Sequence, residues 1–251
     1  MKDFYLRSDV LEALAFQMPF HEVAFSWGRD RVIRPLKVES VEELRALLER
    51  YGSNEAFSVL RSIESFSNAL ELESKPPEAL RFDWDFTIDI DSEEFELAKR
   101  AAGKLGKLLE LFNISFLVKF SGRRGFHFIV PGKVFHVGDS LREYIDAYPR
   151  LPTMIADFVE ACLNEPKLKL DKSIYAPRHL LRCTYSLHEK TGLVSTPVSD
   201  LTRFKLEEAK PENVKASLEH LQLEFKVGSG LELLKACGEL CLPFSFKIWE
   251  L

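Results

Sequence analysis

The most constraining feature of this chain is a ten-residue stretch at 82–91 in which apolar and polar side chains alternate without exception. The stretch reads FDWDFTIDID. Successive side chains of a β-strand point to opposite faces of the sheet. One face of this segment is therefore wholly apolar, and the other carries four carboxylates and a threonine. The pattern predicts one strand over residues 82–91, packed on a core by its apolar face.

Turn and helix signals on either side of this strand predict interleaved helices and strands. Ser40 begins a helix with capping-box spacing, and Gly52 ends it. The other expected elements are helices over 54–72 and 92–112, a hairpin of strands 114–120 and 126–130, helices over 139–148 and 152–163, a strand over 168–173, and helices over 211–221 and 231–239.

This order of elements predicts an α+β fold with a mixed sheet rather than a doubly wound parallel sheet. We expect a single domain over residues 1–251. Within it we expect an N-terminal α/β module over about 1–80, a core over 81–205 and a helical C-terminal segment over 206–251. The final apolar stretch, LCLPFSFKIWEL, is expected to pack as core, with a docking surface as the alternative.

The composition indicates a soluble cytoplasmic protein. The 251 residues are 46% hydrophobic and 29% charged, and no apolar run reaches the roughly 18 residues of a membrane span. The first residues carry charges throughout, unlike a secretory signal. The scattered cysteines are expected to be reduced thiols: Cys162, Cys183, Cys237 and Cys241.

Charge is unevenly distributed along the chain, although the formal net charge is only −5. Residues 38–98 hold sixteen acidic and five basic side chains, whereas residues 167–205 hold eight basic and three acidic ones. A polyanion such as nucleic acid needs a local basic face rather than a basic protein. The alternative is that these charges are solvated surface.

Asp89 and Asp91 are the best candidates for metal ligands. At positions i and i+2 of a strand their side chains point the same way, roughly 6–7 Å apart, which suits Mg²⁺ with its preference for oxygen ligands. Asp83 and Asp85 repeat the spacing but lie farther from the strand-to-helix junction. The alternative is an exposed acidic face, because a lone DxD is common.

Two further segments carry groups suited to phosphate. In SGRRGFH, two glycines give backbone N–H groups close access to an anion, and the side chains supply directed donors; the alternative is a solvated hairpin turn with a core histidine. Asp171 could add a third carboxylate or simply end a turn. The candidate phosphate-binding residues of SGRRGFH are Ser121, Arg123, Arg124 and His127. The second segment follows Asp171 and is a cluster of Arg, His and Lys side chains that includes Arg182, His188 and Lys190.

Taken together, FTIDID, SGRRGFH, the single Asp171 and LLRCTYSLHEKTGL resemble the motifs of the archaeo-eukaryotic primase superfamily, over roughly residues 20–205. The resemblance is to the catalytic small subunit of archaeal primase. It implies a primase-type, RRM-like sheet core with the N-terminal module packed against it. It also implies that Arg182, His188 and Lys190 hold the nucleoside triphosphate.

The chain departs from primase small subunits in lacking a Cys/His zinc module between the first two motifs, so no structural zinc is expected. VSTPVSDL also resembles the polymerase domains of prokaryotic end-joining proteins. The resemblance implies template-dependent nucleotidyl transfer from NTPs or dNTPs by two Mg²⁺ or Mn²⁺ ions on Asp89, Asp91 and Asp171. DNA template, primer strand and a primase large subunit or a ligase are the implied partners.

Two other functions fit the same residues. One is a non-catalytic nucleic-acid-binding subunit, which would bind single strands or primer-template with strong salt dependence. The other is a metal-dependent phosphodiesterase that uses the same carboxylates, although it has no evident use for the triphosphate-type cluster.

Overall fold

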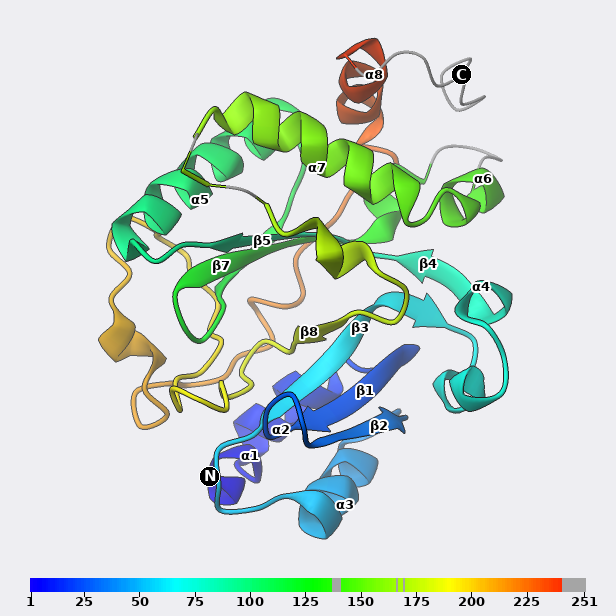
Figure 1. The fold of residues 1–251 in the computed structure, drawn as a ribbon. Helices are drawn as coiled ribbons and strands as arrows, with labels where there is room; N and C mark the ends of the chain where they lie inside the picture. Colours follow the sequence, from blue (N-terminus) through cyan, green and yellow to red (C-terminus); the bar gives the residue numbers. More distant parts are fainter. Residues whose placement is uncertain (137–140, 166, 169, 241–251) are drawn as a thin grey trace.

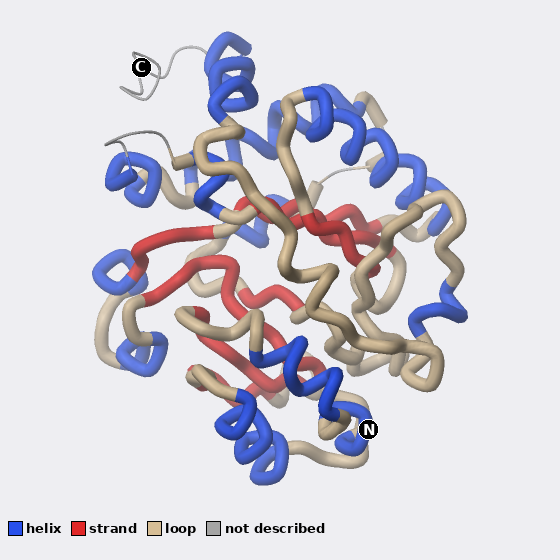
Figure 2. Tube along the Cα trace, turned by 180° about the vertical axis from the view of Figure 1, so that it is seen from behind, coloured by secondary structure: helices blue, strands red, loops and turns tan. Residues whose placement is uncertain are grey.

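The structure is a computed structural model that describes residues 1–136, 141–165, 167–168 and 170–240. Two β-sheets lie between outer layers of helices (Figure 1). Helices α5 (Phe95–Leu111) and α7 (Arg150–Leu163) cover the upper sheet, and α3 (Val41–Tyr51) lies beneath the lower sheet. Seen from behind, loops cross between the helical layers (Figure 2).

The lower sheet has the order β2-β1-β3-β4, with β8 also paired to β3, and the upper sheet has the order β5-β7-β6. The strands are β1 (His21–Ser26), β2 (Val32–Leu36), β3 (Ser58–Phe66), β4 (Arg81–Trp84), β5 (Phe86–Asp91), β6 (Leu117–Phe120), β7 (Gly125–Val130) and β8 (Leu180–Arg182). The remaining helices are α1 (Lys2–Tyr5), α2 (Ser8–Ala15), η1 (Ala69–Glu73), α4 (Pro77–Leu80), η2 (Gly132–Phe135), α6 (Leu141–Asp146), η3 (Lys172–Tyr175), η4 (Leu206–Ala209) and α8 (Leu231–Leu240).

The α+β fold class is confirmed, and every strand pair in the described ranges is antiparallel. The expected mixed sheet is therefore wrong in detail, because the strands divide into two antiparallel sheets. The central hairpin is confirmed as β6 and β7. It places Asp89 of β5 opposite His127 of β7, and Lys119 of β6 on the other side of His127.

The alternating stretch at 82–91 is not one strand. It breaks at Asp85, so β4 pairs with β3 in the lower sheet and β5 pairs with β7 in the upper sheet. Asp85 is held at the break by its backbone N–H, which donates to the carbonyl of Ile63, and by an ion pair of 2.8 Å with Arg61. One acidic face thus becomes two, and only Asp89 and Asp91 remain on β5.

Three other expected elements are wrong. The expected helix over 54–72 contains the buried strand β3, because pairing with β1, β4 and β8 outweighs local helix propensity. The described residues of the expected strand over 168–173 form no strand; η3 begins at Lys172, and Asp171 caps it by accepting from the N–H of Ser173. Turns and irregular chain occupy 211–221.

Each sheet buries its own apolar cluster. The larger cluster packs β5, β6 and β7 against α5, α7 and α8, and the second packs β1 and β3 against α1, α2 and α3. Within the described part of the chain, no helix is long and apolar enough to cross a membrane. Lys169, Cys241 and the rest of the apolar C-terminal stretch after Leu240 lie outside the described residues.

Candidate functional site

The candidate site begins with Asp89, whose carboxylate lies at the face of β5 that meets the lower sheet. Its Oδ1 is 3.6 Å from Nε2 of His127 on the paired strand. Burial raises the pKa of Asp89 to about 7, and the nearby charges of Asp91 and Asp171 add to this effect. The charges of the other two predicted carboxylates therefore act on Asp89, whose own negative charge is poorly compensated.

Asp91 is paired with a residue that the sequence assigned to phosphate. Nε and Nη2 of Arg124 donate to its two carboxylate oxygens at 3.1 and 2.6 Å, and Nη1 of Arg124 donates to Glu93 at 2.5 Å. The side chains of Asp91 and Arg124 are 47% and 31% exposed, so this bidentate pair contributes little to stability and can exchange its partners.

The donor set suits a hard divalent cation, although the ligand sphere is not assembled. Asp171 currently caps η3, accepting from the N–H of Ser173 at 2.9 Å. Within the described ranges, no three His, Cys, Asp or Glu side chains are close enough to hold a metal ion. The oxygen chemistry and the excess negative charge at Asp89 nevertheless fit Mg²⁺ or Mn²⁺. The three-aspartate ligand set remains a prediction.

Arg182 joins the two sheets at this point. From β8 of the lower sheet, its Nη1 donates to the carbonyl of Ser121 at 3.0 Å, in the hairpin turn of the upper sheet. Its Nη2 lies 2.9 Å from Oε2 of Glu189, and its Nε donates to the hydroxyl of Ser58 at 3.2 Å. Its guanidinium is thus fixed in position close to the Asp89 carboxylate, whose pKa its charge lowers.

His188 packs against the glycine turn of the hairpin. A Cβ on Gly122, whose φ is +95°, would lie 2.8 Å from Cβ of His188, so this approach requires glycine. Nδ1 of His188 accepts from the backbone N–H of Lys190 at 3.1 Å. Burial and the charge of Arg182 lower its pKa to about 4. At neutral pH the ring is uncharged and can donate only from Nε2.

The other predicted phosphate ligands are placed less directly. The Ser121 hydroxyl accepts from the N–H groups of Arg123 and Gly125 at 3.4 and 3.2 Å, so it closes the turn. The side chains of Arg123 and Lys190 are exposed.

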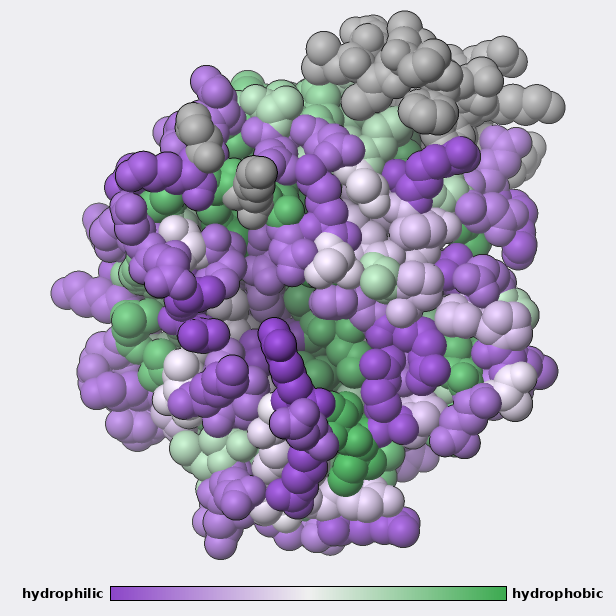
Figure 3. Space-filling model, viewed as in Figure 1, coloured by the Kyte–Doolittle hydropathy of each residue, from purple (hydrophilic) through white to green (hydrophobic). Residues whose placement is uncertain are grey.

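A cleft between the sheets, of about 300 Å³, collects three of the predicted residues. We call it the interlayer cleft; its polar lining includes Ser58, Asp89, His127, His179, Arg182 and Glu189. On the face that carries β8, Figure 3 shows a mainly hydrophilic surface with apolar side chains where the two layers meet.

Sequence reasoning missed Lys119, which is fully buried on β6 beside His127. Its ammonium donates to the carbonyl of Arg182 and, at 3.0 Å, to the hydroxyl of Ser195. Burial lowers its pKa to about 7. The signal in the sequence was a charged residue, Lys119, within the otherwise apolar strand LVKF. In the expected hairpin it lies opposite His127 of the returning strand. Glu189 was also missed, although it follows His188 directly.

Comparison with known proteins shows a likeness of fold. No family model matches the chain, and no curated protein matches it. Among solved structures, the polymerase domain of Mycobacterium tuberculosis ligase D in complex with DNA has a TM-score of 0.53 at 14% sequence identity. The match covers 94% of this chain and 86% of that chain. At this identity the match establishes a likeness of fold and nothing finer.

Proposed function

We propose that this protein is a template-dependent nucleotidyltransferase that extends a nucleic-acid strand from NTPs or dNTPs. The observation that carries the proposal is the interlayer cleft, which Asp89 and the fixed guanidinium of Arg182 both line. The pKa of Asp89 is about 7, and the charges of Asp91, Asp171 and Arg182 all influence it. Paired negative and positive groups are what metal-assisted phosphoryl transfer requires. The shared fold with a DNA-bound polymerase domain supports the same function.

Asp89, Asp91 and Asp171 would hold the divalent cations, Mg²⁺ or Mn²⁺, which when bound polarise the triphosphate and favour ionisation of the attacking hydroxyl. For Asp91 this requires exchange of its partner, because Arg124 now occupies both of its oxygens. The released guanidinium would then be free for a phosphate, which reconciles the two roles predicted for these residues.

The phosphate-binding charge would come from arginine and lysine rather than from histidine. Burial lowers the pKa of His127 well below its ordinary value and that of His188 to about 4, so both rings are neutral at pH 7. We assign them hydrogen-bond donation and orientation. Arg182 supplies a fixed positive charge, and the exposed Arg123 and Lys190 supply adjustable ones.

A primer-extension assay tests this proposal. Purified protein is given labelled primer-template or unprimed template, each nucleotide type, and Mg²⁺ or Mn²⁺. We expect metal-dependent extension that Asp89→Asn abolishes. Extension from a primer alone supports gap-filling with a ligase as partner, whereas synthesis without a primer supports priming with a large subunit. No incorporation under any condition, from folded protein, would refute the proposal.

One observation favours a second candidate, a non-catalytic nucleic-acid-binding subunit. Arg124 neutralises Asp91, and the three aspartates are not gathered into one ligand set in the described ranges. This candidate predicts salt-sensitive binding of primer-template without incorporation. The phosphodiesterase alternative predicts loss of labelled strand in the same assay.

A further inference from the structure

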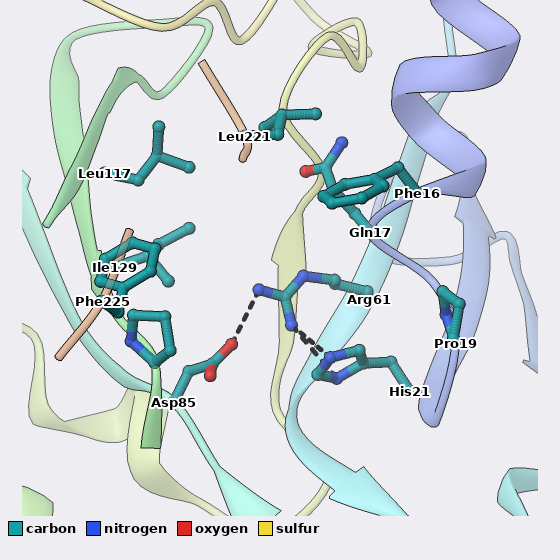
Figure 4. A pocket seen from close by; sticks show the side chains of 11 residues that line it. Phe16, Gln17, Pro19, His21, Arg61, Asp85, Leu117, Ile129, Leu221 and Phe225 are labelled. Atoms are coloured by element: carbon teal, nitrogen blue, oxygen red, sulfur yellow. Dashed lines mark hydrogen bonds and ion pairs between the residues drawn. The ribbon is translucent and has the colours of Figure 1, made fainter. Parts of the chain in front are cut away.

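A second hollow, of about 210 Å³, lies outside the candidate site (Figure 4). We call it the Arg61 pocket. Leu117 and Ile129 form one wall, and Phe16 lies across the hollow from them, beside Gln17. Leu221 and Phe225 also belong to the apolar lining. The pocket is smaller than the usual drug-sized site, so it suits one ring system rather than a whole nucleotide.

The floor of the pocket is polar and almost fully paired. Arg61, 8% exposed, donates from Nη2 to Oδ2 of Asp85 at 2.8 Å and from Nη1 to Nε2 of His21 at 2.9 Å. Burial and the Arg61 charge lower the pKa of His21 to about 3, so its ring is neutral. Nδ1 of His21 accordingly donates to the carbonyl of Glu64. The floor therefore carries one positive and one negative charge, with no net charge.

These properties restrict the ligand. A neutral floor beneath apolar walls gives no advantage to a phosphate or a free cation, whose desolvation would be uncompensated. Among the described residues only Oδ2 of Asp85 accepts a hydrogen bond, from Arg61, so Oδ1 is left for a ligand that donates one. A flat, uncharged ring with N–H groups on its edge satisfies both demands, with its faces against aromatic and aliphatic side chains.

The surroundings suit a ring attached to a phosphate chain. The ammonium of Lys133, an exposed residue, lies 5.6 Å from the centre of the Phe225 ring that lines the pocket. A cation at this position can meet a phosphate outside the hollow without entering it. The pocket also shares β7 with the candidate site, because Ile129 lines the pocket and His127, two positions earlier, lines the interlayer cleft.

We propose that the Arg61 pocket binds a single unpaired nucleobase, with Asp85 accepting from the edge of the base and Phe16 packing on its face. The base can come from a single-stranded nucleic acid or from a free nucleoside. The proposal goes beyond the proposed function, since it concerns a separate hollow and needs neither metal nor turnover.

The test is equilibrium binding of a fluorescein-labelled single-stranded DNA 16-mer, measured by anisotropy at fixed salt in EDTA. Phe16→Ala removes an exposed aromatic wall, and Leu221→Trp fills the hollow. Phe82→Ala is the matched control, because Phe82 is a comparably exposed aromatic that lies outside the pocket. We expect about tenfold weaker binding from each pocket variant and unchanged binding from the control.

Two further measurements complete the design: the Asp85→Ala variant, which removes the proposed hydrogen-bond acceptor, and competition by free nucleosides. Competition by cytidine and guanosine, whose bases carry N–H groups on the pairing edge, identifies a free nucleoside as a ligand; competition only by unlabelled strand identifies nucleic acid. Either result supports the proposal if the Phe16→Ala substitution weakens binding of that ligand. Equal affinities of wild type, Phe16→Ala and Leu221→Trp would overturn it. Because this binding is measured in EDTA and needs no incorporation, whereas the polymerase proposal is read from primer extension, the failure of one proposal is distinguishable from the failure of the other.

Discussion

Nε2 of His127 and Oδ1 of Asp89 lie 3.6 Å apart on paired strands, too far for a hydrogen bond. His127 is 5% exposed, and its Nδ1 has no hydrogen-bond partner in the described structure. Buried polar groups are rarely left in this state, and such exceptions often mark functional sites. The pair therefore presents a carboxylate and an imidazole that both have capacity for a ligand in the cleft.

Asp89→Asn should abolish metal-dependent incorporation while stabilising the metal-free fold, because it removes a buried charge that Asp91 and Asp171 repel. Primer extension and the thermal midpoint in EDTA measure the two effects. Asp83→Asn is the matched control from the same alternating stretch, since Asp83 binds His136 away from the cleft. Loss of activity in both variants would argue against a specific role for Asp89.

The same carboxylate should make stability depend on pH. Its folded pKa is about 7 against an ordinary 3.8, so the folded state binds more protons between these values. Its contribution to the free energy of unfolding therefore falls as the pH rises from about 4 to about 7. Thermal midpoints across this range should decline more steeply for wild type than for Asp89→Asn. Identical slopes would show that Asp89 does not titrate in this window.

Gly122→Ala should displace His188, because the new Cβ would lie 2.8 Å from the histidine Cβ at a backbone φ of +95°. We expect a loss of about 1–3 kcal/mol in unfolding free energy and a higher KM for nucleotide. Gly103→Ala is the matched control. A Cβ there meets nothing within 4 Å inside α5, so it should stabilise by about 0.5–1 kcal/mol. Equal effects at the two glycines would contradict the packing described.

Glu189→Gln should loosen Arg182. Their side chains are only 15% and 14% exposed, and Glu189 also accepts from the Ser58 hydroxyl at 2.7 Å. We expect a loss of about 1–3 kcal/mol in denaturant unfolding. Glu55→Gln, at an ion pair whose members are 73% and 60% exposed, should change nothing measurable. An effect of similar size at Glu55 would show that net charge, rather than this contact, is responsible.

Much of the fold follows from local patterns. The hairpin, the helix after the acidic strand and the apolar face of residues 86–91 were predictable because glycine turns, helix caps and strand alternation act over a few residues. The same patterns were sufficient to single out Asp89, His127 and Arg182, which the fold does bring to one cleft. The ligand roles of these residues remain predictions.

The rest depends on contacts between distant segments. The break at Asp85 is made by Arg61 and the Ile63 carbonyl, about twenty residues earlier, and nothing in the alternation of 82–91 signals it. Strand β3 forms because three other strands pair with it. The ion pair between Arg124 and Asp91 likewise joins two separate motifs. When each motif is considered alone, its charged side chain has no visible partner.

The split of residues 82–91 between the sheets also affects how the cleft can be adjusted. Asp89 and His127 belong to the upper sheet, whereas Arg182 and Ser58 belong to the lower one. The distance between the Asp89 carboxylate and the Arg182 guanidinium therefore depends on how closely the two sheets pack. The buried residues Trp84 and Phe86 flank the break at Asp85 between the two sheets. We expect substitutions there to change the distance between this carboxylate and guanidinium without any substitution in the cleft itself.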